Sequence, residues 1–435
     1  MESRPMALSQ SHRTMTPQLD KIKLGIWCDY GVTLEPTEGI GVFVANLVEG
    51  LLGQPSMEKI LLVSKEGQEQ LLEPLRLLAP DRIEVIGNSK PPFYLRKPWK
   101  TLRQADRRRI ERTGTSIRDQ GPLGWTYRWF ERRVNHSKAS WLEGVDLWLL
   151  PYVGLDQEFN KPTVVIVHDL VTYHFSDGTP PEKLDSFKRL VNQVTDRAKI
   201  VACMSDFILH KDLHGTLGLA SDRTRMVRPA VPRDFRRSSE PPSMLPEGIP
   251  AGRYLLYPAA FRNYKNHQLL LRALPSINRD QPVPWHVVFT GIKQTPPDLL
   301  DLIKDLQLEP WVHVLGKVSR GELESLYRHA FATAVPSLYE QGSFPLMEAL
   351  SFGCPILSSD IPSLREQLAA MGPDAIYFDP HSESDFARAV FELNQDRSGK
   401  LAGQLAGFQR MKQRTWTDVA GEWCKIFHAI LEPTV

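Results

Sequence analysis

The chain has 435 residues, of which 42% are hydrophobic and 24% are charged, the balance of an ordinary globular protein. This length exceeds what one hydrophobic core supports, so two domains of about 200 residues each are expected. The 53 lysines and arginines nearly cancel the 51 acids, which argues against a chain that binds polyanions over its whole surface. The four cysteines form no CxxC pair, so the sequence predicts neither a disulfide-stapled domain nor a thiolate zinc site, and it favours a reducing compartment.

The N-terminal 20 residues are polar and contain Pro5 and Pro17, so we expect a disordered lead at 1–20 and no signal peptide. No apolar run reaches the roughly 18 residues that a membrane-spanning helix needs. The sequence therefore predicts a cytoplasmic protein that is soluble or lies peripherally on the cytoplasmic membrane face.

Short apolar segments alternate with helical patterns from residue 21 onward. Segment 21–30 is the first expected strand, a helical pattern covers 41–53, and a second strand is expected at 59–64. This order is a βαβ unit, which requires a parallel sheet with a right-handed crossover. Further strands are expected at 81–87, 145–151, 163–170, 199–205, 253–259, 284–291, 311–316, 331–337 and 354–360.

A stretch with four prolines and two glycines at 238–252 divides this alternation into two halves. We expect an α/β fold with two Rossmann-like, doubly wound domains that face a central cleft. The N-terminal domain would cover 21–237, the linker 238–252 and the C-terminal domain 253–435.

A basic insertion at 90–138 interrupts the first domain. It contains fourteen lysines and arginines against four acids, and seven aromatic residues lie among these charges. One reading is a solvated basic segment. The other is a segment that seats the protein on an anionic membrane or gathers an anionic acceptor, because tryptophan and tyrosine favour bilayer interfaces.

Two groups of candidate residues follow the strands of the first domain, where a ligand binds in such folds. Gly39 and Gly41 precede the first helix, where glycine allows a close approach of the backbone to an anion, although a plain tight loop has the same sequence. His168, followed by Asp169, ends a fully apolar strand, and it is either a site residue or a structural histidine. No GxSxG segment accompanies this pair, which argues against a serine hydrolase.

The second domain offers cations and glutamates at the corresponding places. Arg262 and Lys265 lie before a helix and could bind a diphosphate, although a solvated basic loop is the alternative. Glu340 precedes a glycine turn, and Glu348 follows eight residues later inside the next helix. Ser343 is expected to cap that helix, and the free N–H groups of its first turn could point at a phosphate. These N–H groups belong to Gly342, Ser343 and Phe344.

With these motifs in order, the chain resembles the family-four retaining glycosyltransferases of the GT-B class, also called group 1 glycosyltransferases. The likeness rests on the E-x7-E element from Glu340 to Glu348, the SFGCPILSSD strand after it, and the VHDL and YPAAFRNYKNH segments. It covers nearly all of the chain from Lys21 onward except the basic insertion.

The resemblance implies transfer of a sugar from a GDP- or UDP-sugar, with GDP-mannose favoured, to a glycan or lipid-linked acceptor in cell-surface polysaccharide synthesis. It implies that Lys265 holds the diphosphate and Glu348 the ribose, while the backbone near Gly316 and Val318 touches the base. His168 and Glu340 would lie at the donor sugar as catalytic residues, and Gly41 beneath the diphosphate or the acceptor. The resemblance also implies retention of the anomeric configuration.

Two departures from the family pattern stand out. The family's diphosphate arginine is replaced by Ala260, for which Arg262 is the nearest substitute, and the turn after Glu340 reads Gln-Gly-Ser-Phe. Because the chain contains no DxD motif, we expect no metal, and we expect no organic cofactor and no nucleic acid partner. The alternatives left open are a GT-B-fold epimerase or phosphorylase and a non-enzymatic binding protein that uses the basic insertion.

Overall fold

The computed structural model describes residues 21–36, 39–88, 142–154, 159–176, 179–232, 244–291 and 295–432. The expected lead at 1–20 and the basic insertion at 90–138 lie outside the described residues, as does the first part of the expected linker. None of the helices in the described part of the chain is long and apolar enough to cross a membrane.

The first domain contains a seven-stranded sheet in the order β3-β2-β1-β4-β5-β6-β7, and all of its strands are parallel. Its strands are β1 (Ile22–Trp27), β2 (Met57–Lys65), β3 (Ile83–Asn88), β4 (Leu147–Leu150), β5 (Thr163–Ile166), β6 (Ile200–Cys203) and β7 (Thr224–Met226). The short strands β4, β5 and β6 are buried along their whole length, as in parallel sheets that helices cover on both faces.

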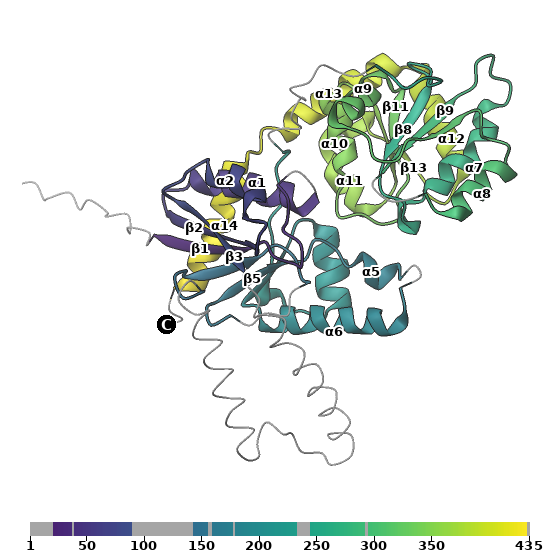
Figure 1. Cartoon of the computed structure of the whole chain (residues 1–435). Coiled ribbons are helices and arrows are strands. Elements are labelled where there is room, and N and C mark those ends of the chain that lie inside the picture. The colour runs from purple at the N-terminus through teal and green to yellow at the C-terminus, as the bar shows by residue number, and fades with distance from the viewer. Residues whose placement is uncertain are drawn as a thin grey trace, which may run out of the picture.

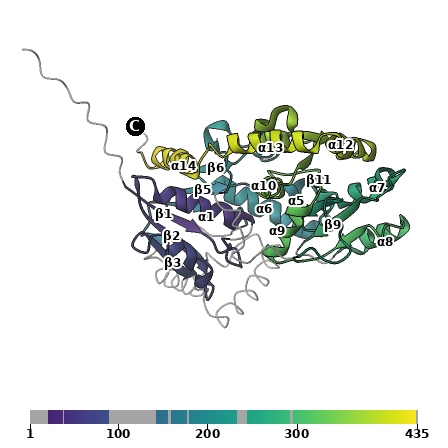
Figure 2. The same cartoon turned by 90° about the horizontal axis from the view of Figure 1, so that it is seen from above.

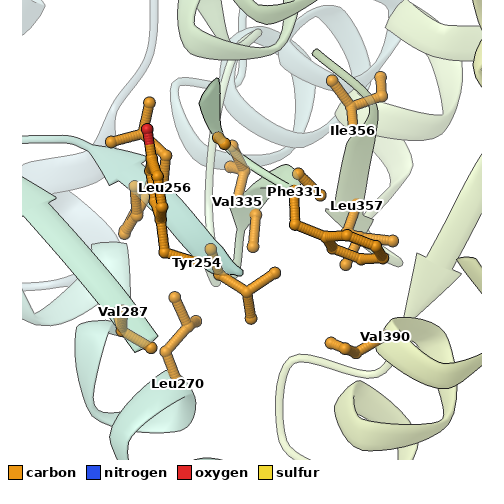
Figure 3. Packing of buried hydrophobic residues seen from close by; sticks show 14 of the residues in the cluster. Tyr254, Leu256, Leu270, Val287, Phe331, Val335, Ile356, Leu357 and Val390 are labelled. Atoms are coloured by element: carbon orange, nitrogen blue, oxygen red, sulfur yellow. The ribbon is translucent and has the colours of Figure 1, made fainter. Parts of the chain in front are cut away.

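The second domain contains a six-stranded parallel sheet in the order β10-β9-β8-β11-β12-β13. Its strands are β8 (Tyr254–Pro258), β9 (His286–Thr290), β10 (Val312–Val314), β11 (Ala332–Val335), β12 (Ile356–Ser359) and β13 (Ile376–Phe378). Figure 3 shows buried residues of its core, among them Tyr254, Leu256, Leu270, Phe331 and Leu357, packed between the strands and the neighbouring helices.

Helices connect the strands and cover both sheets (Figure 1). The helices are α1 (Gly39–Leu52), α2 (Glu73–Arg76), α5 (Val171–His174), α6 (Pro181–Arg197), α7 (His267–Asn278), α8 (Pro297–Asp305), α9 (Arg320–His329), α10 (Phe344–Ser351), α11 (Pro362–Leu368), α12 (Glu383–Gln395), α13 (Arg397–Met411) and α14 (Trp416–Leu431). Short helical segments are η1 (Glu69–Leu71), the π-helix η3 (Ile208–Thr216), η4 (Ser221–Arg223), η5 (Asn263–Lys265) and η6 (Ala369–Asp374). The expected α/β class with two Rossmann-like domains is confirmed.

The last helix corrects the expected assignment of residues 253–435 to the second domain. After α13 the chain returns to the first domain, where α14 lies beside α1 (Figures 1 and 2). Trp416, Trp423 and Phe427 are buried in the first domain's core, and the ring of Trp416 lies 5.6 Å from that of Phe43. The aromatic face of α14 is thus buried in the first domain. The periodicity of its sequence predicts that one face is buried, but it does not predict which sheet that face packs against.

Strands β7 and β13 were not expected from the sequence. Each has only three residues, as does β10, which the sequence did predict within the segment 311–316. Both are edge strands, so they widen their sheets without changing the order of the other strands.

Candidate functional site between the two domains

The candidate site lies where β5 of the first domain and β11 of the second domain end. His168 follows β5, and its Nε2 donates a hydrogen bond to the carbonyl oxygen of Pro151 at 2.8 Å. Its Nδ1 lies 3.2 Å from the side-chain amide of Gln341 in the second domain. Burial lowers the pKa of His168 to about 4, so the ring is neutral at physiological pH and bridges the two domains as a hydrogen-bonding group.

The start of α1 lies on the other side of His168. The Phe43 and His168 rings meet edge to face with their centroids 5.7 Å apart. Gly39 and Gly41 form the first turn of α1 rather than the loop before it, which corrects the expected position. A Cβ at Gly41 would lie 1.6 Å from the carbonyl oxygen of Glu35, so the fold requires glycine there whether or not a ligand binds.

Lys265 and Glu340 form an ion pair in the second domain. The Lys265 Nζ lies 2.5 Å from Glu340 Oε1, which also accepts a hydrogen bond from the Ser337 hydroxyl at 2.7 Å. Burial opposes the charge on Lys265, but the Glu340 carboxylate together with Tyr257 and Tyr264 outweighs burial, so the pKa of Lys265 is raised. Lys265 therefore remains a fixed cation, held at the end of η5 before α7 begins.

Asp169 adds a carboxyl group from the first domain near this pair. Burial raises its pKa to about 6, although the backbone N–H of Val171 donates to it at 3.1 Å. The negative charge of Glu340 raises this pKa further, and the positive charge of Lys265 lowers it. Carboxylates from both domains thus share the field of one lysine.

Asp212 joins the domains beside Glu340. This fully buried carboxylate accepts hydrogen bonds from the Leu170 backbone and from His174 Nε2, at 2.9 and 2.8 Å. It also accepts a hydrogen bond from the hydroxyl of Tyr339, the residue before Glu340. The Tyr339 ring lies in the aromatic core of the first domain, against the ring of Phe207, although the residue belongs to the second domain.

Glu366 on α11 makes a second bridge between the domains. Its carboxylate accepts hydrogen bonds from the backbone N–H groups of Asp206 and Phe207, at 3.0 and 3.3 Å. Arg228 pairs with the same carboxylate at 2.9 Å and with Asp206 at 2.5 Å. Because Asp206 and Phe207 directly precede η3, the carboxylate satisfies orphan N–H groups at a helix start.

Glu348, the second glutamate of the E-x7-E element, has different neighbours from Glu340. Its Oε1 accepts from Arg320 at 2.8 Å, and its Oε2 accepts from the Tyr327 hydroxyl at 2.9 Å. Both partners lie on α9, so the carboxylate fixes α10 to α9. The two glutamates therefore lie on one loop–helix segment but do not share a partner.

The turn between the two glutamates departs from expectation at Ser343. Ser343 is the residue before α10, but its side chain makes no capping hydrogen bond. Its backbone N–H donates to Gln367 Oε1 at 2.8 Å, and Gln367 donates back to its carbonyl at 3.1 Å. Of the three N–H groups expected to be available to a phosphate, that of Ser343 is thus occupied, whereas Gly342 and Phe344 are exposed.

The remaining predicted residues lie on the second domain's side of the candidate site. Gly316 has a φ of +66°, which favours glycine, and its carbonyl accepts from the N–H of Gly291 at 2.9 Å. Val318 is half-buried two residues on, before Ser319 caps α9. Arg262 is exposed directly before η5, so its side chain extends into solvent rather than into the ion pair.

The comparisons with known proteins agree with this architecture. Residues 247–406 match the model of the family "Glycosyl transferases group 1". This match covers most of the second domain and identifies that domain with the group 1 glycosyltransferases. The chain is 24% identical over 258 residues to the O-antigen chain mannosyltransferase B of Escherichia coli, covering 58% of this chain and 66% of that protein.

Solved structures show the same GT-B fold. Sucrose-phosphate synthase from Thermosynechococcus elongatus superposes with a TM-score of 0.60 at 14% identity, covering 94% of this chain and 99% of that one. Anabaena Alr3699/HepE, crystallised with UDP and glucose, gives a TM-score of 0.59 at 14% identity, covering 94% and 100%. Both matches cover the two domains together, so the expected GT-B architecture is confirmed.

The sequence reasoning missed several residues that join the two domains. They are Asp212, Tyr339, Gln341 and Glu366. Asp212 and Glu366 lie in ordinary polar helical segments, and their partners in the other domain are more than 100 residues away in the chain. Only Gln341 had a signal, because it occupies the departure from the family's turn that follows Glu340.

Proposed function

We propose that this protein transfers a sugar from a nucleotide-diphosphate sugar to a glycan or lipid-linked acceptor in cell-surface polysaccharide synthesis. The observation that carries the proposal is the Lys265–Glu340 ion pair, with Asp169 near it from the other domain and His168 in contact with the adjacent Gln341. A buried cation suits a departing diphosphate, and nearby carboxylates suit sugar hydroxyls.

The proposed reaction breaks the bond between the anomeric carbon and a diphosphate oxygen and forms a bond from that carbon to an acceptor hydroxyl oxygen, which releases its proton as the nucleoside diphosphate leaves. Charge develops on the departing diphosphate, and Lys265 stabilises it with help from the exposed turn at Gly342 and Phe344. Donor binding would separate the Lys265 ammonium from Glu340, which then accepts hydrogen bonds from the sugar. We assign the ribose to Glu348 and the base to the backbone near Gly316 and Val318.

We further propose a metal-independent reaction with retention of configuration. Lys265, with Arg262 at the edge of the same segment, supplies positive charge that other transferases take from a cation. His168, neutral and fixed by Pro151, would orient the donor sugar rather than transfer a proton, since its pKa lies far below neutrality.

The donor is proposed to be a GDP- or UDP-sugar, with GDP-mannose favoured. Similarity to an O-antigen chain mannosyltransferase supports mannose, whereas the structural neighbour solved with UDP and glucose keeps uridine donors open. The test is a screen of nucleotide sugars for release of the nucleoside diphosphate, with and without an acceptor glycan. If the acceptor increases release of the nucleoside diphosphate for none of the donors, this result would contradict sugar transfer and would favour an epimerase or a phosphorylase.

We also propose a cytoplasmic location at the membrane face, supported by the composition of residues 90–138, which lie outside the described residues. Their excess of ten positive charges would attract anionic lipids, at about 1 kcal/mol for each engaged basic residue. The protein should sediment with anionic vesicles at low salt, and a variant lacking 90–138 should not. Equal sedimentation of both, or of neither, would contradict this location.

A further inference from the structure

A cavity of 1070 Å³ lies in the first domain, and none of the candidate site residues lines it. Its wall includes Thr163 and Ile200, the first residues of β5 and β6. Because these strands are parallel, their first residues lie at the edge of the sheet opposite to His168. The cavity is therefore separate from the cleft, and the chemistry proposed above does not use it.

The lining of this cavity is strongly basic. Five cations line it against two acids, Asp196 and Asp222. The cations are Lys161, Arg197, Lys199, Arg223 and Arg225. So many like charges around one hollow repel each other unless an anion lies among them.

Three of the five cations, Arg197, Arg223 and Arg225, have interactions with the protein itself. Arg223 donates to the carbonyl oxygens of Thr195 and Ala198 at 2.7 and 2.8 Å, and Arg225 to that of Asp222 at 2.9 Å. Within the described residues, by contrast, the ammonium groups of Lys161 and Lys199 have no carboxylate partner. Arg223 and Arg225 thus shape the wall, and the two lysines are the cations that a ligand would meet.

Part of the lining of the cavity is apolar. Ile426 and Ile430 of α14 line it, one helical turn apart, together with the buried Val194 of α6. A lining that combines apolar and basic side chains suits a molecule that has an anionic head and a hydrocarbon part. The chain's own insertion at 90–138 does not match, because it has an excess of ten positive charges.

We propose that this cavity binds a lipid phosphate, whose phosphate contacts Lys161 and Lys199 and whose hydrocarbon lies against Ile426 and Ile430. Because α14 is the helix that returns from the second domain, the ligand would fasten this helix to the amino edge of the first sheet. The site is independent of the cleft, so it holds or fails without regard to the proposed transferase activity.

The test measures binding of monomeric dihexanoylphosphatidate, below its micelle concentration, to the full chain by titration calorimetry. We expect the double variant Lys161→Glu/Lys199→Glu to bind at least roughly tenfold more weakly than the parent, because two attractions become repulsions. The control is Arg279→Glu/Lys304→Glu, which reverses two exposed cations of the second domain and should bind as the parent does. Loss of binding in both variants, or in neither, overturns the proposal.

A second comparison separates a lipid site from a simple phosphate site. Ile430→Ser should weaken dihexanoylphosphatidate binding and leave binding of inorganic phosphate unchanged, with its helical circular dichroism equal to that of the parent. Dihexanoylphosphatidylcholine, whose head has no net charge, should bind more weakly than the phosphatidate. Equal affinity for all three ligands, or an Ile430→Ser variant that binds phosphatidate like the parent, overturns the assignment to a lipid.

Discussion

The hydroxyl of Tyr339 in the second domain donates a hydrogen bond to Asp212 in the first domain, where the acceptor carboxylate is completely buried. Asp212 also accepts from the Leu170 backbone, which follows His168 and Asp169. Tyr339 precedes Glu340, so one buried carboxylate connects the two sides of the candidate site. Domain closure and the position of the proposed catalytic groups are therefore coupled through these two residues.

We predict that Tyr339→Phe weakens domain closure more than it weakens either domain. The variant loses one hydrogen bond to a charged acceptor, worth roughly 1.5–3 kcal/mol, although Asp212 retains its other donors. Donor KM should rise several-fold, while circular dichroism stays unchanged. Tyr377→Phe is the matched control, because Tyr377 is a partly exposed tyrosine of β13 in the second domain. Equal donor KM for the two variants would contradict the coupling.

Lys265→Ala should greatly reduce donor use. It removes the proposed diphosphate contact, and a charge-assisted hydrogen bond of roughly 1.5–3 kcal/mol corresponds to a loss of about 10- to 150-fold in kcat/KM. It also leaves Glu340 without its cation, so thermal stability should be compared in Lys265→Ala and Glu340→Gln/Lys265→Ala. Lys304→Ala, on the exposed side of α8, is the control. Wild-type kcat/KM in Lys265→Ala would remove this residue from the site.

Glu348→Ala should reduce donor affinity by a similar factor if its carboxylate binds ribose hydroxyls. The change also removes the acceptor of the buried Tyr327 hydroxyl, so Glu348→Gln is the sharper variant, because its amide oxygen still accepts from Tyr327. Tyr327→Phe keeps the carboxylate and should retain donor affinity. The measurement is titration of the free protein with the nucleoside diphosphate. Equal binding by Glu348→Gln and the parent would show that this glutamate only joins α9 to α10.

Asp169 and His168 should give opposite pH dependences of stability. The pKa of Asp169 is raised to about 6, so between pH about 4 and 6 the folded protein holds a proton that the unfolded chain has lost. The contribution of Asp169 to the free energy of unfolding therefore falls as pH rises. The pKa of His168 is lowered to about 4, so between pH about 4 and 6.5 the unfolded chain holds a proton that the folded protein lacks. The contribution of His168 to the free energy of unfolding therefore rises with pH.

Relative to the parent, Asp169→Asn should therefore gain stability as pH rises through this window, and His168→Gln should lose it. Each proton changes the free energy of unfolding by up to about 1.4 kcal/mol per pH unit. Urea midpoints measured from pH about 4.5 to 7 test this, with the difference from the parent plotted for each variant. Parallel profiles of the two variants would show that neither carries the assigned protonation.

An excess of chelator should leave the rate of sugar transfer unchanged. This expectation rests on Lys265 as a fixed cation and on a sequence without a DxD motif. The measurement is nucleoside diphosphate release after dialysis against EDTA, with added magnesium or manganese as the comparison. An absolute requirement for either ion would contradict metal independence.

The sequence by itself determined the two-domain α/β architecture and the likeness to group 1 glycosyltransferases. Apolar runs such as those of β5 and β11 are continuous because both faces of a parallel sheet are covered, and turn residues mark where each strand ends. The same reasoning identified the segments with His168, Lys265 and Glu340 as strand ends facing a cleft. These are local properties of short segments, which is why they can be read without a structure.

Only the tertiary structure decided which groups meet across the cleft and where the last helix packs. The Asp212–Tyr339 and Glu366–Arg228 contacts join residues 127 and 138 positions apart, and nothing in the surrounding sequence distinguishes them from solvated polar side chains. The aromatic face of α14 could have covered either sheet, and the shape of the surface beside α1, where Gly50 admits the backbone of Trp416, selected the first. Such pairings depend on how two domains and a returning helix fit together, a property of three-dimensional packing that periodicity along the chain does not encode.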